Sequence, residues 1–163
     1  MDNDNRELFE DQSLEQDEVS EIDQYFDKYL TDDPTDLKPG EYNLEESMRR
    51  ESTPTIQLVN KILLTALQEN AKELRIIPLA SEILVRSNQG AGFYNLLNTK
   101  LPLPLIEPLV NILRLNAGME KLARNKPVVG KMRLLYQNTV QEAVVRTLPG
   151  PHGTSLSLSF RGA

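Results

Sequence analysis

The side chains best suited to catalysis or metal binding are scarce in this chain. Among its 163 residues there is no cysteine, and the single histidine, His152, lies between Pro151 and Gly153. Zinc sites draw mainly on Cys and His, and a Ser or Cys nucleophile needs a neighbouring base. We therefore predict no catalytic residue, no metal and no cofactor, and interpret His152 as a loop residue bonded to a backbone carbonyl. A hard-cation site built from carboxylates alone is the alternative that stays open.

Two glycine-containing segments lack the spacing of phosphate-binding loops. A P-loop has a glycine five residues before its Gly-Lys pair and a Ser or Thr after it. Here Asn125 stands five residues before Gly130-Lys131, and Met132 follows. Gly90-Ala91-Gly92 is too short for a dinucleotide-binding fingerprint, and no long parallel-sheet unit surrounds it. We interpret Gly130 as a turn glycine.

Carboxylates are abundant but are not arranged for acid–base catalysis. Residues 1–53 hold 18 acids and 5 bases, net −13, whereas residues 54–163 hold 6 acids and 13 bases, net +7. Paired-carboxylate chemistry needs fixed geometry, which a polar arm does not supply, and the six acids of the second part are scattered. The chain is therefore predicted not to be an enzyme, and its opposite charges predict an arm that interacts beside a basic domain.

The net +7 of residues 54–163 does not by itself indicate a nucleic-acid-binding protein. Phosphate neutralisation by Lys and Arg dominates such binding, but aromatic platforms for bases normally accompany it. Only four aromatic residues lie in this part, and they do not alternate with the basic ones: Phe93, Tyr94, Tyr136 and Phe160. The acidic arm would also compete for the same basic surface. We therefore expect a protein partner rather than nucleic acid.

The acidic arm, residues 1–53, has too few apolar side chains to offset the entropy cost of folding, so we expect it to be largely disordered. One amphipathic helix is predicted within it, near residues 13–30, where Ser13 provides a cap. Its apolar positions form the predicted partner-binding stripe: Val19, Ile22, Phe26, Tyr29 and Leu30. Docking of this helix on its own domain and docking on a partner both stay open. Residues 41–52 are predicted to be linker or a weak second helix.

The remaining residues, 54–163, are predicted to form one α+β domain. Thr53-Pro54 caps a helix over 54–71, and a second helix is predicted over 104–117, ended by Gly118. Strands are predicted at 73–77, 82–87, 93–97, 131–137, 140–148 and 154–161. In the last of these, leucines alternate with serines, which indicates one apolar and one polar face. The order of elements predicts a mainly antiparallel sheet with two main helices packed on it.

Three segments of this domain resemble one family in order and spacing. The family pattern A-S-D-I-H-I-E-P corresponds to residues 71–78, and its Ala-Gly and Pro-x-x-Gly elements correspond to residues 117–131. Its S-T-L-P-x-x-H-G element corresponds to residues 146–153. The shared positions are Pro78, Ala117, Gly118, Pro127, Gly130, Thr147, Leu148, Pro149, His152 and Gly153. Through this ordered series of segments, residues 54–160, about two thirds of the chain, resemble the second N-terminal domain of type II secretion and type IV pilus assembly ATPases.

The resemblance is degenerate at its polar positions. Glu73 and Arg75 replace the family's Asp and His, and Val128-Val129 replaces its Gln-Asp pair. Of the arginines that approach nucleotide in the family, Arg86 alone is in place. The chain also ends where the ATPase domain would begin. The resemblance thus implies a PAS-like fold and a mobile, subunit-contacting role, without the coupling to ATP hydrolysis.

These observations predict a cytoplasmic, non-enzymatic accessory or regulatory factor of a type IV pilus or type II secretion motor. Its partner would be an assembly ATPase subunit or the cytoplasmic platform, with recruitment to the inner-membrane face. No apolar run approaches the roughly 20 residues of a membrane span. A PAS-like small-molecule or nucleotide sensor is one alternative, with an anion held by Arg86, Lys121, Arg124 and Lys131. The N-terminal part of a longer assembly ATPase is the other, and homo-oligomerisation stays open.

Overall fold

A computed structural model describes residues 2–29, 36–119 and 126–162, the backbone alone for 2–14 and 162. The chain divides into two compact units, Met1–Asp32 and Asp33–Ala163. The second unit therefore includes residues 33–53, which the composition assigned to the arm. Leu30, Lys121 and Arg124 from the predicted sites lie outside the described residues.

The first unit contains a single described element, the helix α1 (Asp2–Tyr29). It begins well before the cap predicted at Ser13. The predicted apolar positions Val19, Ile22 and Phe26 recur every three or four residues, so they lie along one side of the helix. Near its end, the ring centroids of Tyr25 and Tyr29 are 4.9 Å apart. The amphipathic character predicted from the sequence thus belongs to a helix of 28 residues.

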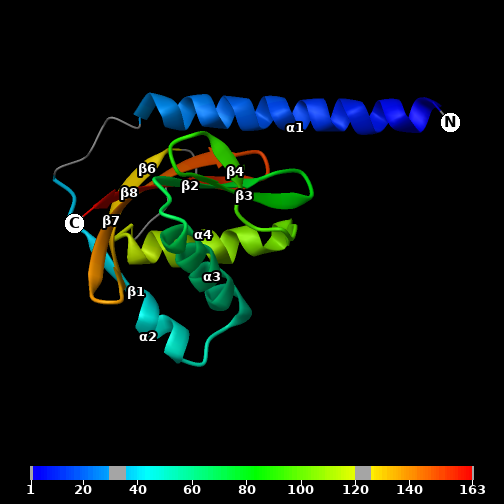
Figure 1. The fold of residues 1–163 in the computed structure, drawn as a ribbon. Coiled ribbons are helices and arrows are strands. Elements are labelled where there is room, and N and C mark those ends of the chain that lie inside the picture. Colours follow the sequence, from blue (N-terminus) through cyan, green and yellow to red (C-terminus); the bar gives the residue numbers. More distant parts are fainter. Residues whose placement is uncertain (1, 30–35, 120–125, 163) are drawn as a thin grey trace. The chain divides into compact units, whose positions relative to one another are not determined.

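The second unit is built on one sheet of eight described strands (Figure 1). Seven strands follow the order β1-β6-β7-β8-β2-β3-β4, and β5 pairs with β3. Every pairing is antiparallel except that of β1 with β6, which is parallel. The strands are β1 (Gly40–Asn43), β2 (Glu73–Pro78), β3 (Glu82–Asn88), β4 (Phe93–Asn95), β5 (Leu101–Pro102), β6 (Val128–Tyr136), β7 (Thr139–Gly150) and β8 (Gly153–Gly162). The predicted α+β class with a mainly antiparallel sheet is confirmed.

The two main helices, α3 (Pro54–Gln68) and α4 (Ile106–Asn116), lie on the same side of the sheet (Figure 1). The Thr53 hydroxyl accepts a hydrogen bond from the Ile56 backbone N–H at 3.3 Å, so the predicted cap of α3 is confirmed. A short helix, α2 (Leu44–Arg49), follows β1, and a 3₁₀ turn (Leu103–Leu105) precedes α4. The core forms between these helices and the apolar face of the sheet. Its helix side is supplied by Val59, Ile62, Leu63, Ala66, Leu109, Val110 and Leu113.

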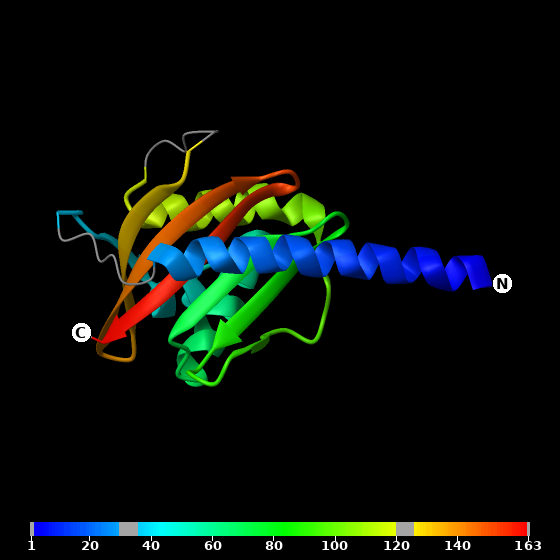
Figure 2. The ribbon, with the colours of Figure 1, turned by 90° about the horizontal axis from the view of Figure 1, so that it is seen from above.

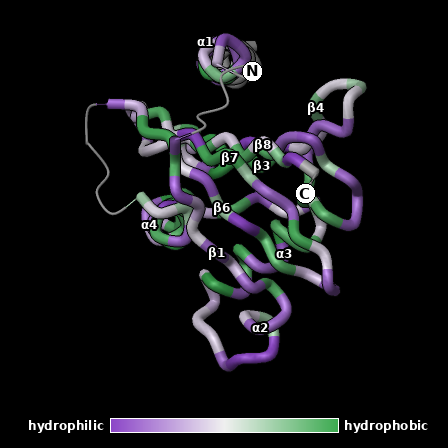
Figure 3. The backbone as a smooth tube through the Cα atoms, turned by 90° about the vertical axis from the view of Figure 1, so that its left-hand side faces the viewer, coloured by the Kyte–Doolittle hydropathy of each residue, from purple (hydrophilic) through white to green (hydrophobic). Residues whose placement is uncertain are grey.

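The sheet has one apolar and one polar face because side chains alternate along each strand. Leu156, Leu158 and Phe160 of β8 belong to the core, as do Leu74 and Ile76 of β2. The intervening residues of the same strands are mostly polar, which Figure 3 shows as changing hydropathy along the tube. Figure 2 shows the strongly twisted course of these strands from above. The face opposite α3 and α4 therefore carries polar and charged side chains, several of which are buried: Glu73, Arg75, Arg146, Ser157 and Ser159.

Two local expectations differ from the structure. Gly130 lies inside β6 and not in a turn. A Cβ there would come within 2.6 Å of the Ala117 carbonyl oxygen. A glycine is therefore needed because β6 and the end of α4 approach each other closely. Residues 41–43, the start of the stretch 41–52 predicted as linker or weak second helix, form the parallel edge strand β1 together with Gly40, and residues 44–49 of that stretch form the short helix α2. Gly90 and Gly92 lie between β3 and β4 and have φ of +125° and +115°, a conformation that glycine adopts readily.

Candidate functional site

A row of arginines crosses the polar face of the sheet. The strand register places Arg146 of β7 opposite Ser157 of β8, Ser157 opposite Arg75 of β2, and Arg75 opposite Arg86 of β3. Directly opposed residues point to the same face of a sheet. We call these four residues the arginine row. With strands about 4.8 Å apart, its three intervals span roughly 14 Å.

Two of the arginines share one aromatic ring. The guanidinium carbon of Arg75 lies 4.4 Å from the centroid of the Phe93 ring, and that of Arg86 lies 4.8 Å from it. Like charges directly opposite each other destabilise a sheet, whereas a cation within about 6 Å of a ring is attracted by its π-face. Phe93, from the short strand β4, thus offsets part of the repulsion and holds the two guanidinium groups near a common position.

One carboxylate fixes the centre of the row. Glu73 accepts a hydrogen bond from the Arg75 Nε and another from the Ser157 hydroxyl at 2.9 Å. Glu73 stands two residues before Arg75 on β2, so both side chains point to the polar face. Because a carboxylate can accept several hydrogen bonds, Glu73 orients Arg75 and Ser157 together.

The row and its neighbour carry a local excess of positive charge. Next to the arginine row, the register aligns Lys131, Val144, Ser159, Glu73 and Asn88. The two rows together hold four bases and one acid, which leaves a net charge of 4 − 1 = +3. This local sign is opposite to the net charge of −6 of the whole chain. Much of this charge is buried, with Arg75 0% and Arg146 7% exposed. Buried positive charge favours anionic groups as partners, because it has lost its hydration.

The predicted anion-contact residues do not come together as one group. Arg86 belongs to the arginine row, but Lys131 lies on β6, four strand intervals or about 19 Å away. The Lys131 Nζ is 3.3 Å from a carboxylate oxygen of Glu142 on the neighbouring strand. Arg75 and Arg146, which the sequence did not single out as site residues, take their place beside Arg86. The alternation of side chains along β2 and β7 could place Arg75 and Arg146 on the polar face. Which residues they stand beside depends on the strand register, and that cannot be read from the sequence.

One group of family-like positions joins α4 to the sheet. Gly118 has φ of +76°, which ends α4, and Ala117 is packed in the core. A Cβ at Gly130 would contact Ala117, and a Cβ at Gly40 would lie 2.0 Å from the Asn116 carbonyl oxygen. The Ala-Gly and Pro-x-x-Gly elements thus meet where α4 ends against β1 and β6. Pro127 stands just before β6.

A second group surrounds the turn between β7 and β8. Gly153 has φ of +128°, and a Cβ there would contact the side chains of Ile106 at 3.3 Å and Pro78 at 3.6 Å. His152 occupies the turn itself, and Leu148 and Pro149 lie at the end of β7. The Thr147 hydroxyl accepts a hydrogen bond from the Val128 N–H at 3.0 Å. These positions act in packing and turn formation.

The comparisons with known proteins give no independent assignment. No family model matches the chain, and no curated protein matches it. Within residues 2–29, 36–119 and 126–162, no group of three or more His, Cys, Asp or Glu side chains is placed to hold a metal ion. None of the helices described is long and apolar enough to cross a membrane.

Proposed function

We propose that this protein is a non-enzymatic binding module whose arginine row receives an acidic segment of a protein partner. Arg75 is 0% and Arg146 7% exposed, so this segment would have to displace the groups that bury them. The observation that carries the proposal is the alignment of Arg75, Arg86 and Arg146 across three strands. Guanidinium groups bind carboxylates through paired hydrogen bonds, and Arg loses less freedom than Lys in making them. Phe93 holds the side chains of Arg75 and Arg86 in place before a ligand binds. Glu73 does the same for Arg75 and Ser157, and this lowers the entropy cost of binding.

The surroundings of the row favour an amphipathic partner. On the side away from Glu73, the next pairs along the strands are Leu148 with Ser155 and Ile77 with Leu84. An acidic helix with one apolar stripe could place its carboxylates on the arginines and its apolar side chains on Leu148 and Leu84. Helices laid on a surface through such stripes are a common mode of peptide recognition.

The partner that we propose is a subunit of a type IV pilus or type II secretion motor, either the assembly ATPase or its cytoplasmic platform. Support comes from the family-like order of motifs and from the two places where those motif residues meet, around Gly130 and around Gly153. In this role the chain would act as an accessory factor that binds the motor without hydrolysing ATP. Co-purification from a type IV piliated bacterium, with the motor ATPase and platform detected by name, tests this part.

Substituting both central arginines tests the row itself. In R75Q/R86Q, we expect the dissociation constant for a fluorescein-labelled Glu/Leu/Ala helical peptide to rise by at least tenfold, because hydrogen bonds to charged groups contribute about 1.5–3 kcal/mol each. Fluorescence anisotropy with the full chain measures it. Since the arm carries net −13, the titration is repeated with its acids changed to amides.

Two further variants separate the row from general basic charge. K61Q/K126Q removes two exposed bases outside the row and should leave the affinity unchanged. R75K/R86K keeps the charge but loses the guanidinium fork, so it should bind with intermediate affinity. Equal loss in K61Q/K126Q and R75Q/R86Q would reject the row as the site. Thermal stabilisation by ATP, without any response to the peptide, would favour the nucleotide-sensor alternative.

A further inference from the structure

A cleft of about 620 Å³ opens at the other end of the sheet, between β1, α2, the start of α3 and the end of α4. Its volume lies in the range of about 300–1,000 Å³ typical of ligand sites. It is lined by side chains of the second unit alone, and none of the arginine-row residues contributes to it. The cleft is therefore a second candidate surface, separate from the row.

The cleft runs along the edge of the sheet. Three consecutive residues of β1, Glu41, Tyr42 and Asn43, line it. Successive side chains on a strand point to opposite faces, so a cleft that touches all three borders the strand's edge. Within the described residues, β1 pairs only with β6, and its other edge has no partner strand. Unpaired backbone N–H and C=O groups at such an edge can accept an added strand.

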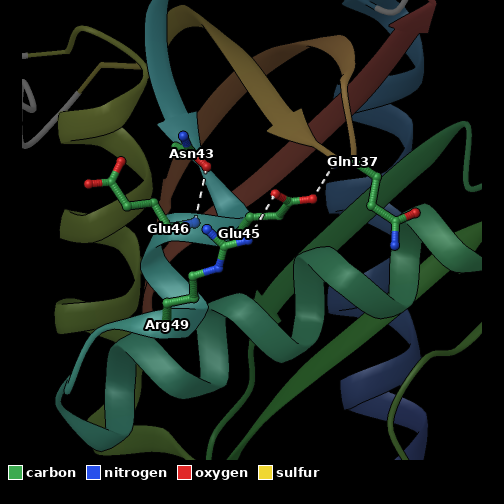
Figure 4. A network of polar contacts seen from close by, with 5 residues as sticks. All are labelled: Asn43, Glu45, Glu46, Arg49 and Gln137. Atoms are coloured by element: carbon green, nitrogen blue, oxygen red, sulfur yellow. Dashed lines mark hydrogen bonds and ion pairs between the residues drawn. The ribbon is translucent and has the colours of Figure 1, made fainter.

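The walls of the cleft are held by specific contacts. Asn43 caps α2 by accepting a hydrogen bond from the Glu46 N–H at 3.1 Å (Figure 4). Glu45 accepts another from the Gln137 N–H at 2.7 Å, which ties α2 to the turn between β6 and β7, and Arg49 pairs with Glu45 at 3.8 Å (Figure 4). At the opposite end, the absent side chain of Gly40 lets β1 approach the carboxyl end of α4. The cleft is thus largely formed before any ligand enters.

A polar network forms part of the inner wall. The Tyr42 hydroxyl donates to the side-chain oxygen of Asn60, and the Ser47 hydroxyl lies 3.1 Å from the same oxygen and 3.3 Å from the Tyr42 hydroxyl. The Asn60 amide donates to the Ser47 hydroxyl at 3.0 Å. These groups bond to one another across β1, α2 and α3. This network stabilises the inner wall of the cleft. Because its polar groups bond to one another, the specificity for a ligand comes from the other walls.

The remaining walls combine acid groups with apolar side chains. Glu41, Glu46 and Glu51 line the cleft against a single base, Arg50, which forms an ion pair with Glu46. The local balance is 1 − 3 = −2. The apolar part includes Ile56, Ile112 and Leu115, and Leu115 is 60% exposed, unusual for a large apolar side chain next to a core. A cationic ligand with apolar groups fits this combination.

We propose that the cleft binds a basic peptide in extended conformation, which adds a strand to the free edge of β1. Its Lys or Arg side chains would lie against Glu41 and Glu51, and an apolar side chain between them against Leu115. The edge of β1 supplies backbone hydrogen bonds, and Leu115 supplies the apolar contact. The acids favour a ligand of positive charge.

A fluorescein-labelled hexapeptide of alternating Lys and Val tests the proposal with the full-length chain. Anisotropy should show saturable binding, and E41Q/E51Q should weaken it about fivefold, the size expected for two partly exposed ion pairs. L115N should remove the apolar contact without adding charge, and so weaken binding as well. E107Q is the matched control, because Glu107 is an exposed acid on α4 outside the cleft.

Pairing of the peptide backbone with β1 can be tested separately from the charge contacts. A peptide methylated on alternate backbone nitrogens keeps its charge but cannot pair with β1, so its binding should be lost. Hydrogen exchange at residues 40–43 should slow when the unmodified peptide is bound. Equal binding of methylated and unmodified peptides, or no saturable binding at all, would overturn the proposal. R75Q/R86Q should bind the basic peptide normally, so failure here and failure of the arginine row are distinguishable.

Discussion

Tyr42 shows how one side chain links the short edge strand to the helices. Its ring is packed in the core, and its hydroxyl bonds to Asn60 of α3. Burial raises the pKa of Tyr42 above its ordinary value of 10.0, although the hydrogen bond with Ser47 acts in the opposite direction. A buried phenol avoids the charged form because the interior solvates an anion poorly. The neutral hydroxyl is therefore part of the folded state.

The raised pKa predicts a specific pH dependence of stability. Below about pH 10 the Tyr42 contribution is fully present, and it is lost as pH rises through the raised folded pKa, because the unfolded chain releases its proton more readily. Y42F should lower the free energy of unfolding by about 1 kcal/mol at neutral pH, as one hydrogen bond is removed. The difference between wild type and Y42F should narrow above pH 10. Urea unfolding from pH 8 to pH 11.5 measures both.

Tyr94 serves as the control for that experiment. Its pKa is also raised, first because its hydroxyl donates a hydrogen bond to Glu69 and second because of burial. Both wild type and Y42F retain Tyr94, so its effect cancels in the difference between them. A gap between the two proteins that stays constant up to pH 11.5 would contradict the role given to Tyr42.

At the scale of elements, the close approach of α4 to β6 explains why residue 130 is a glycine. Gly130 has no room for a side chain, since a Cβ would meet the Ala117 carbonyl oxygen at 2.6 Å and the Met119 side chain at 2.9 Å. Met119 can move, but the backbone carbonyl of Ala117 cannot do so without shifting the end of α4. The spacing between Ala-Gly and Pro-x-x-Gly thus has a packing cause.

Replacing Gly130 by alanine should therefore destabilise the second unit. We expect G130A to lower the free energy of unfolding by about 1–3 kcal/mol, the usual cost of overpacking. Urea denaturation followed by circular dichroism measures the change. R133A on the same strand removes an exposed side chain and should stay within about 0.5 kcal/mol of wild type. A G130A protein as stable as R133A would show that α4 shifts freely.

The elements differ in how well the sequence predicts them. The helix from Pro54 has a cap, a proline and an apolar stripe, and it forms almost as predicted, ending at Gln68 and not at residue 71. The strand β1 has no such signal, because Gly-Glu-Tyr-Asn shows no alternation. It becomes a strand through contacts with distant residues, the packing of Gly40 on Asn116 and the pairing of Tyr42 with Leu134.

The candidate site is predictable only in part for the same reason. Alternation along β8 predicts a polar face, and the family resemblance marks Arg86 as a candidate. The arginine row, however, depends on which residues of four strands stand opposite one another. Register is set by long-range packing, and a shift by one residue would move every side chain to the other face. Arg75 and Arg146 join Arg86 only once that register is known.

At the scale of the whole molecule, local and net charge have opposite signs. The chain carries −6 overall, because the −13 of residues 1–53 outweighs the +7 of residues 54–163, while the arginine row and its neighbouring row carry +3. The interaction of an acidic peptide with the protein therefore has a long-range repulsive part and a short-range attractive part. Salt screens them differently, because the Debye length falls from about 30 Å at 0.01 M to about 10 Å at 0.1 M and 3 Å at 1 M.

This difference predicts a maximum in affinity as salt is varied. From 0.01 to 0.1 M, screening of the net negative charge should strengthen binding of the acidic helical peptide to the full chain. From 0.1 to 1 M, screening at the row itself should weaken it. Anisotropy titrations across this range measure the curve. In R75Q/R86Q, the decrease in affinity from 0.1 to 1 M salt should disappear. When the acids of the arm are changed to amides, the increase in affinity from 0.01 to 0.1 M should disappear. Affinity that rises steadily up to 1 M would mean that apolar contacts, and not the arginines, hold the peptide, because only charge–charge attraction is weakened by added salt.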